Sequence, residues 1–214
     1  GENPARWRDH LVHSLPEPKK VKEVVHHAAM PYEDLPEFMA RYPDINLDLV
    51  ISEYPIDLVE AGIDLAIRVG PLGDVNLAAR RIGDLERVIS AAPAYLERFG
   101  VPRKPEDLAH HNCLTVTDIA GQSEWPFHGQ QAVHLMPVRG NITVNNAETL
   151  YELALQGLGI IRLSDLIVGP AIRSGWLVPI LVDSRQPEPL PLHAVYAASR
   201  RRPRRPECHR PRRG

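Results

Sequence analysis

Short segments with the apolar pattern of a β-strand alternate along this chain with helical patterns. Residues 35–42 carry apolar side chains at helical spacing, and the pattern ends at a proline. Over residues 45–51 the apolar residues recur at every second position, which predicts a half-buried strand. A short helix is expected at 56–61 and a more fully buried strand at 63–69. Strands that alternate with helices in this way predict the α/β class, with a parallel or mixed sheet covered by helices.

The same alternation continues to residue 198 and predicts two such units. Helices are expected after Pro93, after Pro105, from Ala147 to Gln156 and, in a shorter form, from Ser164. The other segments predict strands, at 87–92, 113–117, 132–138, 140–144, 160–163, 176–181 and 192–198.

The charge of the chain is unevenly distributed. Residues 199–214 hold eight of the 25 Lys and Arg residues and one of the 27 Asp and Glu residues, so this tail carries +7. The preceding 198 residues carry 17 minus 26, or −9. An acidic body repels phosphate, so only the tail could contact nucleic acid. The tail has almost no apolar residues, and we expect it to be disordered.

Several classes of protein are disfavoured by what the sequence lacks. It has no run of the roughly 18–20 apolar residues that a membrane span needs, and residues 1–20 lack the apolar core of a secretory signal. We therefore expect a cytoplasmic protein with no membrane partner. No metal-binding spacing, nucleophile motif, Walker A sequence or dinucleotide fingerprint is present, so we expect no catalytic residue, no metal, no cofactor and no enzymatic activity. Cys113 and Cys208 are expected to be free thiols.

The first candidate ligand site follows the strand predicted at 63–69. Arg68, Val69, Gly70 and Pro71 lie at the carboxyl end of this strand, where open α/β sheets bind ligands. An arginine here could pair with a carboxylate through two hydrogen bonds. The alternative is a surface turn with a solvated arginine.

The second candidate site is the start of the helix predicted from Ala147. Asn145, Asn146, Ala147 and Thr149 surround a helix N-terminus, whose N–H groups and dipole favour an anion. Glu148 would compete with such a ligand. The alternative is that Asn146 simply caps the helix.

The third candidate site lies in residues 117–127. Trp125 and Phe127 could form an aromatic wall, and Thr117 could donate a hydrogen bond to a ligand. The alternative is that these aromatic residues, which have strand spacing, belong to the core.

A series of phrases makes the chain similar to a known family. The phrases are YPDINLDL, DLVEAGIDLAIRVG, ISAAPAYLERFG, PEDLAHHNCL, LALQGLGI and LPLHAVY, in this order. Their order and spacing resemble the effector-binding domain of LysR-type transcriptional regulators, and the resemblance covers about residues 35–198.

The resemblance implies a two-lobed fold of the periplasmic-binding-protein type 2. Lobe I would comprise 35–84 and 192–198, lobe II would comprise 85–191, and two crossing strands near 83–90 and 190–198 would join them. A small carboxylate or aromatic effector would bind between the lobes, and by position Arg68 to Pro71, Thr117 and the helix start at Asn145 to Thr149 would face it. The family also implies an antiparallel dimer, which pairs the helix at 35–42 with the helix at 147–156 of a second copy or of a full-length regulator.

Three departures from the family pattern lead to further expectations. The helix-turn-helix has no counterpart, so we expect no direct sequence-specific DNA binding. Residues 1–34 form an atypical N-terminal segment in which VKEVVHHAAMPYED replaces the opening strand, which would remove one wall of the site and leave lobe I incomplete. The last helix of lobe I is replaced by the tail at 199–214.

Residues 1–41 have a resemblance of their own. ENPARWRDHL and VHHAAMPYEDLPEFMA are similar to the segment that joins the two domains of phage-type tyrosine recombinases, but the catalytic residues of that family have no counterpart. An alternative hypothesis is therefore a chimeric or truncated mobile-element product with no retained activity. A DNA-binding recombinase fragment and a periplasmic solute carrier are further alternatives, and the missing signal sequence argues against the carrier.

Overall fold

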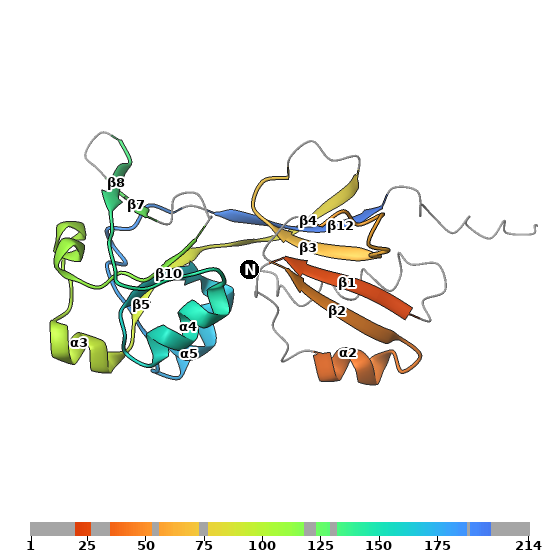
Figure 1. Ribbon diagram of the computed structural model, residues 1–214, viewed down its shortest axis with the longest axis horizontal. Helices are drawn as coiled ribbons and strands as arrows, with labels where there is room; N and C mark the ends of the chain where they lie inside the picture. The colour runs from red at the N-terminus through yellow and green to blue at the C-terminus, as the bar shows by residue number, and fades with distance from the viewer. Residues whose placement is uncertain are drawn as a thin grey trace, which may run out of the picture.

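Two lobes joined by two strand connections make up the chain (Figure 1). The computed structural model describes residues 20–26, 35–52, 56–72, 77–117, 123–128, 132–187 and 189–197. The expectations for residues 199–214, for Cys208 and for most of residues 1–34 lie outside these ranges.

Lobe I is built on a five-stranded sheet with the order β2-β1-β3-β12-β4. Its strands are β1 (Lys20–His26), β2 (Asn46–Ser52), β3 (Leu65–Val69), β4 (Leu77–Leu85) and β12 (Leu190–Ala197). β1 runs parallel to β2 and β3, whereas β12 runs antiparallel to β3 and β4. The carboxyl ends of β1, β2 and β3 therefore lie at one edge of the sheet.

Strand β1 corrects the expectation that lobe I lacks its opening strand. Lys20 to His26 pair with Asn46 to Ser52 over the full length of β2, and Glu23 to Val25 pair with β3. The segment that departs from the family sequence therefore supplies a central strand of the sheet, and lobe I begins before residue 35.

The segment expected as a helix at 56–61 is a series of hydrogen-bonded turns. The Asp57 carboxylate accepts hydrogen bonds from the backbone N–H groups of Val59 and Glu60, at 2.8 and 3.0 Å. The turns end at Gly62, which has a φ of 65°. This left-handed conformation favours glycine and stops helical hydrogen bonding, so the prediction of a helix here is wrong. Helix α2 (Leu35–Arg41) forms as expected.

Lobe II contains a three-stranded antiparallel sheet with the order β10-β5-β11. Its strands are β5 (Arg87–Ala91), β10 (Ile160–Ser164) and β11 (Val178–Pro179). A bridge between Cys113 and Ile160 joins it to the parallel pair β6 (Thr115–Val116) and β9 (Thr143–Val144). The hairpin of β7 (Glu124–Phe127) and β8 (His134–Pro137) lies at the top of the lobe in Figure 1.

The helices of lobe II are α3 (Pro93–Phe99), α4 (Ala147–Leu155) and α5 (Asp165–Arg173), with a 3₁₀ helix at Pro105–His110. The start of α3 at Pro93 and its end at Gly100, with a φ of 87°, match the sequence prediction. One buried cluster lines α4 and α5, and a second surrounds Trp125 and Phe127.

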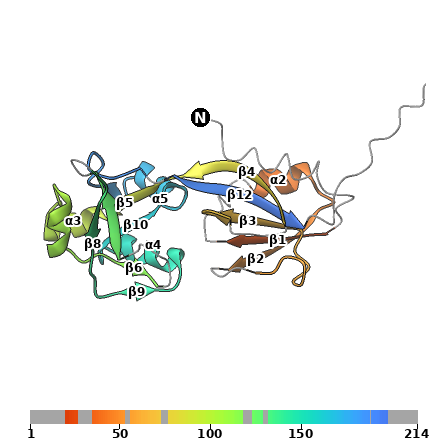
Figure 2. The same cartoon turned by 90° about the horizontal axis from the view of Figure 1, so that it is seen from above.

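Only Glu86 separates β4 in lobe I from β5 in lobe II. Figure 2 shows β4 running from lobe I toward β5 in lobe II. The second connection enters lobe I at Leu190, which pairs with Leu85 at the end of β4. A hydrophobic cluster spans the junction, because Leu166 and Ile167 of α5 pack against residues of β3, β4 and β12. The predicted crossing strands near 83–90 and 190–198 thus agree with β4, β5 and β12.

Candidate functional site

The end of β3 lies beside the strand that returns from lobe II. Val69 pairs with Leu192, and the Gly70 N–H donates a 2.8 Å hydrogen bond to the Pro191 carbonyl. Gly70 has a φ of 97°, which a residue with a Cβ rarely adopts. The loop predicted as the first candidate site is therefore fixed next to the connection between the lobes.

The Arg68 guanidinium already has a partner in the protein. Its Nη2 donates a 3.0 Å hydrogen bond to the Ile56 carbonyl, which holds the 56–62 turns against β3. Its Nε is buried and has no hydrogen-bond partner among the described residues. Arg68 thus supports the fold of lobe I, and only the rest of its guanidinium could pair with a carboxylate.

Thr117 and the start of α4 meet at the carboxyl end of the β6–β9 pair. The Thr117 N–H and its hydroxyl both donate to the Val144 carbonyl, at 2.6 and 3.0 Å. The expected donation from this hydroxyl to a ligand is therefore replaced by an internal bond, and the exposed oxygen can only accept in this arrangement. Asn145 follows Val144 directly and is exposed.

Asn146 is the N-cap of α4, as the sequence predicted. Its Oδ1 accepts a 2.7 Å hydrogen bond from the Thr149 N–H, and its extended backbone starts the helix. Ala147 is buried in the lobe II core, so its side chain is not open to a ligand and only its backbone is available at the start of the helix. The side chains of Asn145 and Thr149 are exposed and open to a ligand.

Trp125 is a core residue, which favours the alternative reading of the sequence, that these aromatic residues belong to the core, over an aromatic wall of a ligand site. Trp125 and Phe127 are both fully buried, in a cluster with Ile89, Tyr95 and Leu108. Both residues alternate with exposed or half-buried neighbours on β7, so their spacing reflects the inner face of a hairpin. Thr117, Asn145, Asn146 and Thr149 remain together in lobe II, while Arg68 to Pro71 lie in lobe I.

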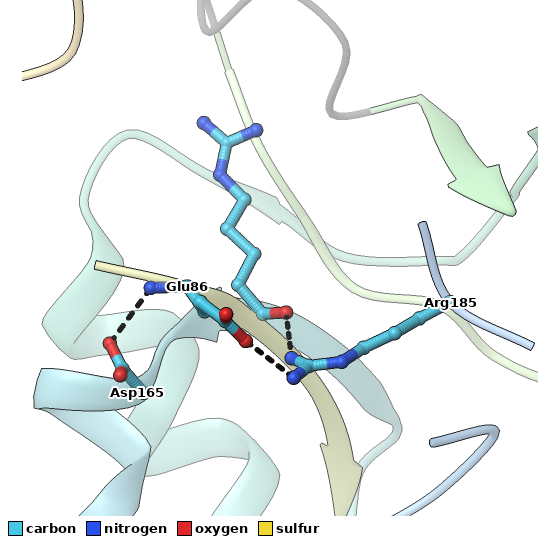
Figure 3. Close-up of polar contacts among 4 residues, drawn as sticks. Glu86, Asp165 and Arg185 are labelled. Carbon is cyan, nitrogen blue, oxygen red and sulfur yellow. Dashed lines mark hydrogen bonds and ion pairs between the residues drawn. The ribbon is translucent and has the colours of Figure 1, made fainter. Parts of the chain in front are cut away.

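A polar cluster at the junction was missed by the sequence reasoning. Glu86, between β4 and β5, contacts Asp165 at the start of α5 and Arg185 in the second connection (Figure 3). These contacts join residues 79 and 99 positions apart, and no local pattern in the sequence links them. Asp165 carries one weak signal, since an acidic residue is common in the first turn of a helix.

Other kinds of site find little support in the described part of the chain. Across residues 20–26, 35–52 and the later described ranges, no group of three or more His, Cys, Asp or Glu side chains is arranged to hold a metal ion. No described helix combines the length and the apolar character of a membrane span.

The sequence model of the LysR substrate binding domain matches residues 34–208. The chain belongs to this family. The family assignment agrees with the two-lobed α/β structure, which has the periplasmic-binding-protein-like fold of LysR regulatory domains. The relatives described below are transcriptional regulators.

Relatives of known structure and sequence support the assignment. The regulatory domain of CrgA from Neisseria meningitidis is 31% identical, with a TM-score of 0.79 over 86% of this chain and 91% of that domain. CrgA of Neisseria meningitidis serogroup B is 37% identical over 160 residues, which are 75% of this chain and 53% of CrgA. An HTH-type transcriptional regulator of Haemophilus influenzae is 34% identical over 170 residues, 79% of this chain and 59% of that protein. The chain thus matches little more than half the length of these two regulators.

Proposed function

We propose that this chain binds a small carboxylate or aromatic effector between its two lobes. The observation that carries the proposal is the position of two groups of candidate residues. One is the loop from Arg68 to Pro71 in lobe I, and the other is Thr117 with the start of α4 in lobe II. Each lies at the carboxyl end of parallel strands, where ligands bind in α/β sheets, and Gly70 is held against Pro191 at the junction. The N-terminus of α4 favours a negative ligand group.

Binding would act by changing the relative population of two lobe arrangements. An effector that contacts both Thr149 in lobe II and the Gly70 loop in lobe I binds the closed arrangement better than the open one. That difference in affinity is what shifts the equilibrium between the two. In the whole regulator, which we place in the cytoplasm, the change would alter how the protein acts on its promoter.

A thermal unfolding screen against aromatic and aliphatic carboxylic acids tests the proposal. A ligand at 100 times its dissociation constant adds about 2.7 kcal/mol to the free energy of unfolding, which raises the transition temperature. Asn145→Ala should reduce the effect of the ligand without lowering the unligated transition, because this side chain is exposed. The proposal fails if no acid raises the transition, or if Asn145→Ala and Thr149→Val both respond as the wild type does.

A substitution of Glu148 should change carboxylate binding in the opposite direction, toward higher affinity. Its exposed carboxylate lies in the first turn of α4, where it repels an anionic ligand. Glu148→Gln should therefore strengthen the binding of carboxylates and leave the binding of neutral aromatic compounds unchanged, which distinguishes the two effector classes.

We further propose that the module works as a homodimer or as a mixed dimer with a full-length regulator. Helix α2 has no buried residue, although Leu35, Phe38, Met39 and Tyr42 form a half-buried apolar stripe on it and after it. Covering this stripe with α4 of a second copy would remove apolar surface from water. Co-expression with a full-length relative, followed by affinity purification of one tagged partner, should recover both chains. Recovery of the tagged chain alone would exclude the mixed dimer.

The charge of residues 199–214 favours a second candidate function, in which the tail binds DNA or RNA through phosphate. The +7 of these residues contrasts with the −9 of the preceding residues. Binding that weakens steeply with salt and is lost on deletion of 199–214 would support it. A broad unfolding transition that no acid shifts, without nucleic-acid binding, would instead favour a mobile-element product with no retained activity.

A further inference from the structure

All the threonines of the chain gather around the β6–β9 pair and the start of α4. The 214 residues include four threonines, at positions 115, 117, 143 and 149. Thr115 lies in β6, Thr143 in β9, Thr117 directly after β6, and Thr149 in the first turn of α4. Thr117 and Thr149 belong to the proposed effector site, and the position of the other two suggests a role beside it.

Thr115 and Thr143 form a pair of hydroxyl groups on one face of the two strands. They are partners in the parallel β6–β9 register, and their Oγ1 atoms lie 3.3 Å apart. The residues that follow them, Val116 and Val144, point to the other face and pack in the core cluster that lines α4 and α5. Thr143 is exposed and Thr115 half-buried, so a ligand can reach the pair from solvent.

The hydroxyl pair extends the polar surface of the effector site along the strands. Thr117 and Asn145 follow Thr115 and Thr143 by two residues, which places the two groups roughly 6–7 Å apart along the strand direction. Asn145 and Thr149 are exposed as well. The lobe II part of the site thus presents neutral hydroxyl and amide groups that lead up to the N-terminus of α4.

These groups favour a ligand that both donates and accepts hydrogen bonds. The Thr117 hydroxyl donates to the Val144 carbonyl, so its exposed oxygen needs a donor, which a deprotonated carboxylate lacks. Within the Thr115–Thr143 pair one hydroxyl donates to the other, and the pair keeps a hydrogen to donate and lone pairs to accept. A hydroxyl group on the ligand can satisfy both needs.

The same groups argue against an aromatic effector. Trp125 and Phe127, the side chains expected to stack on an aromatic ring, are fully buried in the core. An apolar ring that displaced water from the threonine hydroxyls would leave them without hydrogen-bond partners, which is unfavourable. The described part of the lobe II site therefore suits a polar ligand body better than an apolar one.

We propose that the effector is a polyhydroxylated aliphatic carboxylate, such as a sugar acid. Its carboxylate lies at the N-terminus of α4, and its hydroxyl groups bind Thr117 and the Thr115–Thr143 pair. The proposal rests on the proposed effector site and narrows the class of ligand that this site takes. Sites built to bind ligand hydroxyl groups discriminate strongly against analogues that lack them, because their own polar groups then lose partners.

Matched ligands that differ in their hydroxyl groups test the proposal. Gluconate, galactonate and mannonate have the carbon chain and the carboxylate of hexanoate and add hydroxyl groups in different arrangements. Isothermal titration calorimetry of the full chain should give at least one of these sugar acids a Kd about tenfold or more below those of hexanoate and benzoate. Hexanoate or benzoate binding as tightly as the tightest sugar acid would overturn the proposal and leave the effector site standing. Binding of none of these acids would overturn both.

Variants of the hydroxyl pair separate recognition of the ligand from stability of the fold. Thr143→Val removes an exposed hydroxyl and keeps the branched shape, so it should weaken binding of the preferred sugar acid by about threefold to tenfold. Thr143→Ser keeps the hydroxyl and should retain most of the affinity. Ser174→Ala removes a hydroxyl at the end of α5 and is the control, which should bind as the wild type does. Wild-type affinity in Thr143→Val, or an equal loss in Ser174→Ala, would overturn the role of the pair.

Discussion

Asn112 ties together three loops at the end of lobe II. Its Nδ2 donates to Asn141 Oδ1 and to the Leu158 carbonyl, at 2.8 and 2.7 Å, and its Oδ1 accepts from the Asn141 N–H at 2.9 Å. Gly140 fits beside this residue only because it has no Cβ. A Cβ at position 140 would collide with the carbonyl oxygen of Cys113.

Gly140→Ala should therefore lower the free energy of unfolding by about 1–3 kcal/mol, since a collision with the Cys113 backbone forces one of the two segments to shift. Chemical denaturation monitored by circular dichroism measures the change. Gly83→Ala is the control, because nothing lies within 4 Å of a Cβ there, and its stability should stay within about 0.5 kcal/mol of the wild type. Equal stability of both variants would contradict the expected collision.

His111 gives the stability a dependence on pH. Burial lowers the pKa of His111, and its Nδ1 lies 3.2 Å from the Tyr95 hydroxyl, which can donate to the neutral ring. The unfolded chain, with the ordinary pKa near 6.5, then binds a proton more readily than the folded chain. The free energy of unfolding therefore decreases as the pH falls below this value. It keeps decreasing until the pH has passed the pKa of His111 in the folded protein.

We expect the loss of stability between about pH 7.5 and about pH 5.5 to be smaller in His111→Gln than in the wild type. Urea denaturation at the two pH values measures it. His134→Gln, at an exposed position of β8 in the same lobe, should keep the loss of the wild type. An unchanged pH dependence in His111→Gln would show that this histidine does not carry the effect.

At the scale of elements, helix α4 depends on its cap. The Asn146 side chain satisfies the Thr149 N–H at 2.7 Å, and without it that donor loses its partner within the helix end. Asn146→Ala should cost about 0.5–2 kcal/mol of stability, whereas Asn146→Ser should retain most of it because serine is also a good N-cap. Thermal unfolding compares the two, and equal losses would argue against a capping role.

Elements whose apolar residues recur with a clear period, or whose ends carry a capping residue, were predictable from the sequence. Elements that depend on contacts distant in the sequence were not. The helices α3 and α4 have Pro93 and Asn146 at their starts, and the structure confirms both. Strand β4 was missed as an element because it is an edge strand, half exposed on both faces, with no alternation between Leu77 and Arg81. Strand β1 was missed because its sequence, KVKEVVH, places charges in what is a central parallel strand.

The candidate site was predictable only where local rules decide the geometry. Asn146 followed from the capping preference, and Gly70 from the end of a strand. The burial of Trp125 depends on β8 and α3, which pack around it from elsewhere in the sequence. The Arg68 contact to Ile56 and the Arg185 contact to Glu86 likewise join residues whose proximity only the fold determines.

At the scale of the whole molecule, α5 connects the cores of the two lobes. Ile167 packs against the lobe II cluster and also against the cluster that contains Leu65, Ile67 and Leu192 of lobe I. Leu166 packs only against the second of these clusters. Its side chain therefore contributes to the contact between the lobes more than to the core of its own lobe.

Leu166→Ala should weaken the coupling between the lobes selectively. We expect faster amide hydrogen exchange in β3 and β12 of lobe I, although the substitution lies in lobe II, because truncating this side chain exposes the face on which it packs. Ile172→Ala on the same helix is the matched control, since Ile172 packs against the lobe II cluster alone and should speed exchange in β10 and α5. Hydrogen exchange followed by mass spectrometry separates the two patterns. If Leu166→Ala left β3 and β12 protected as in the wild type, the packing of α5 against lobe I would make no measurable contribution to the stability of that lobe.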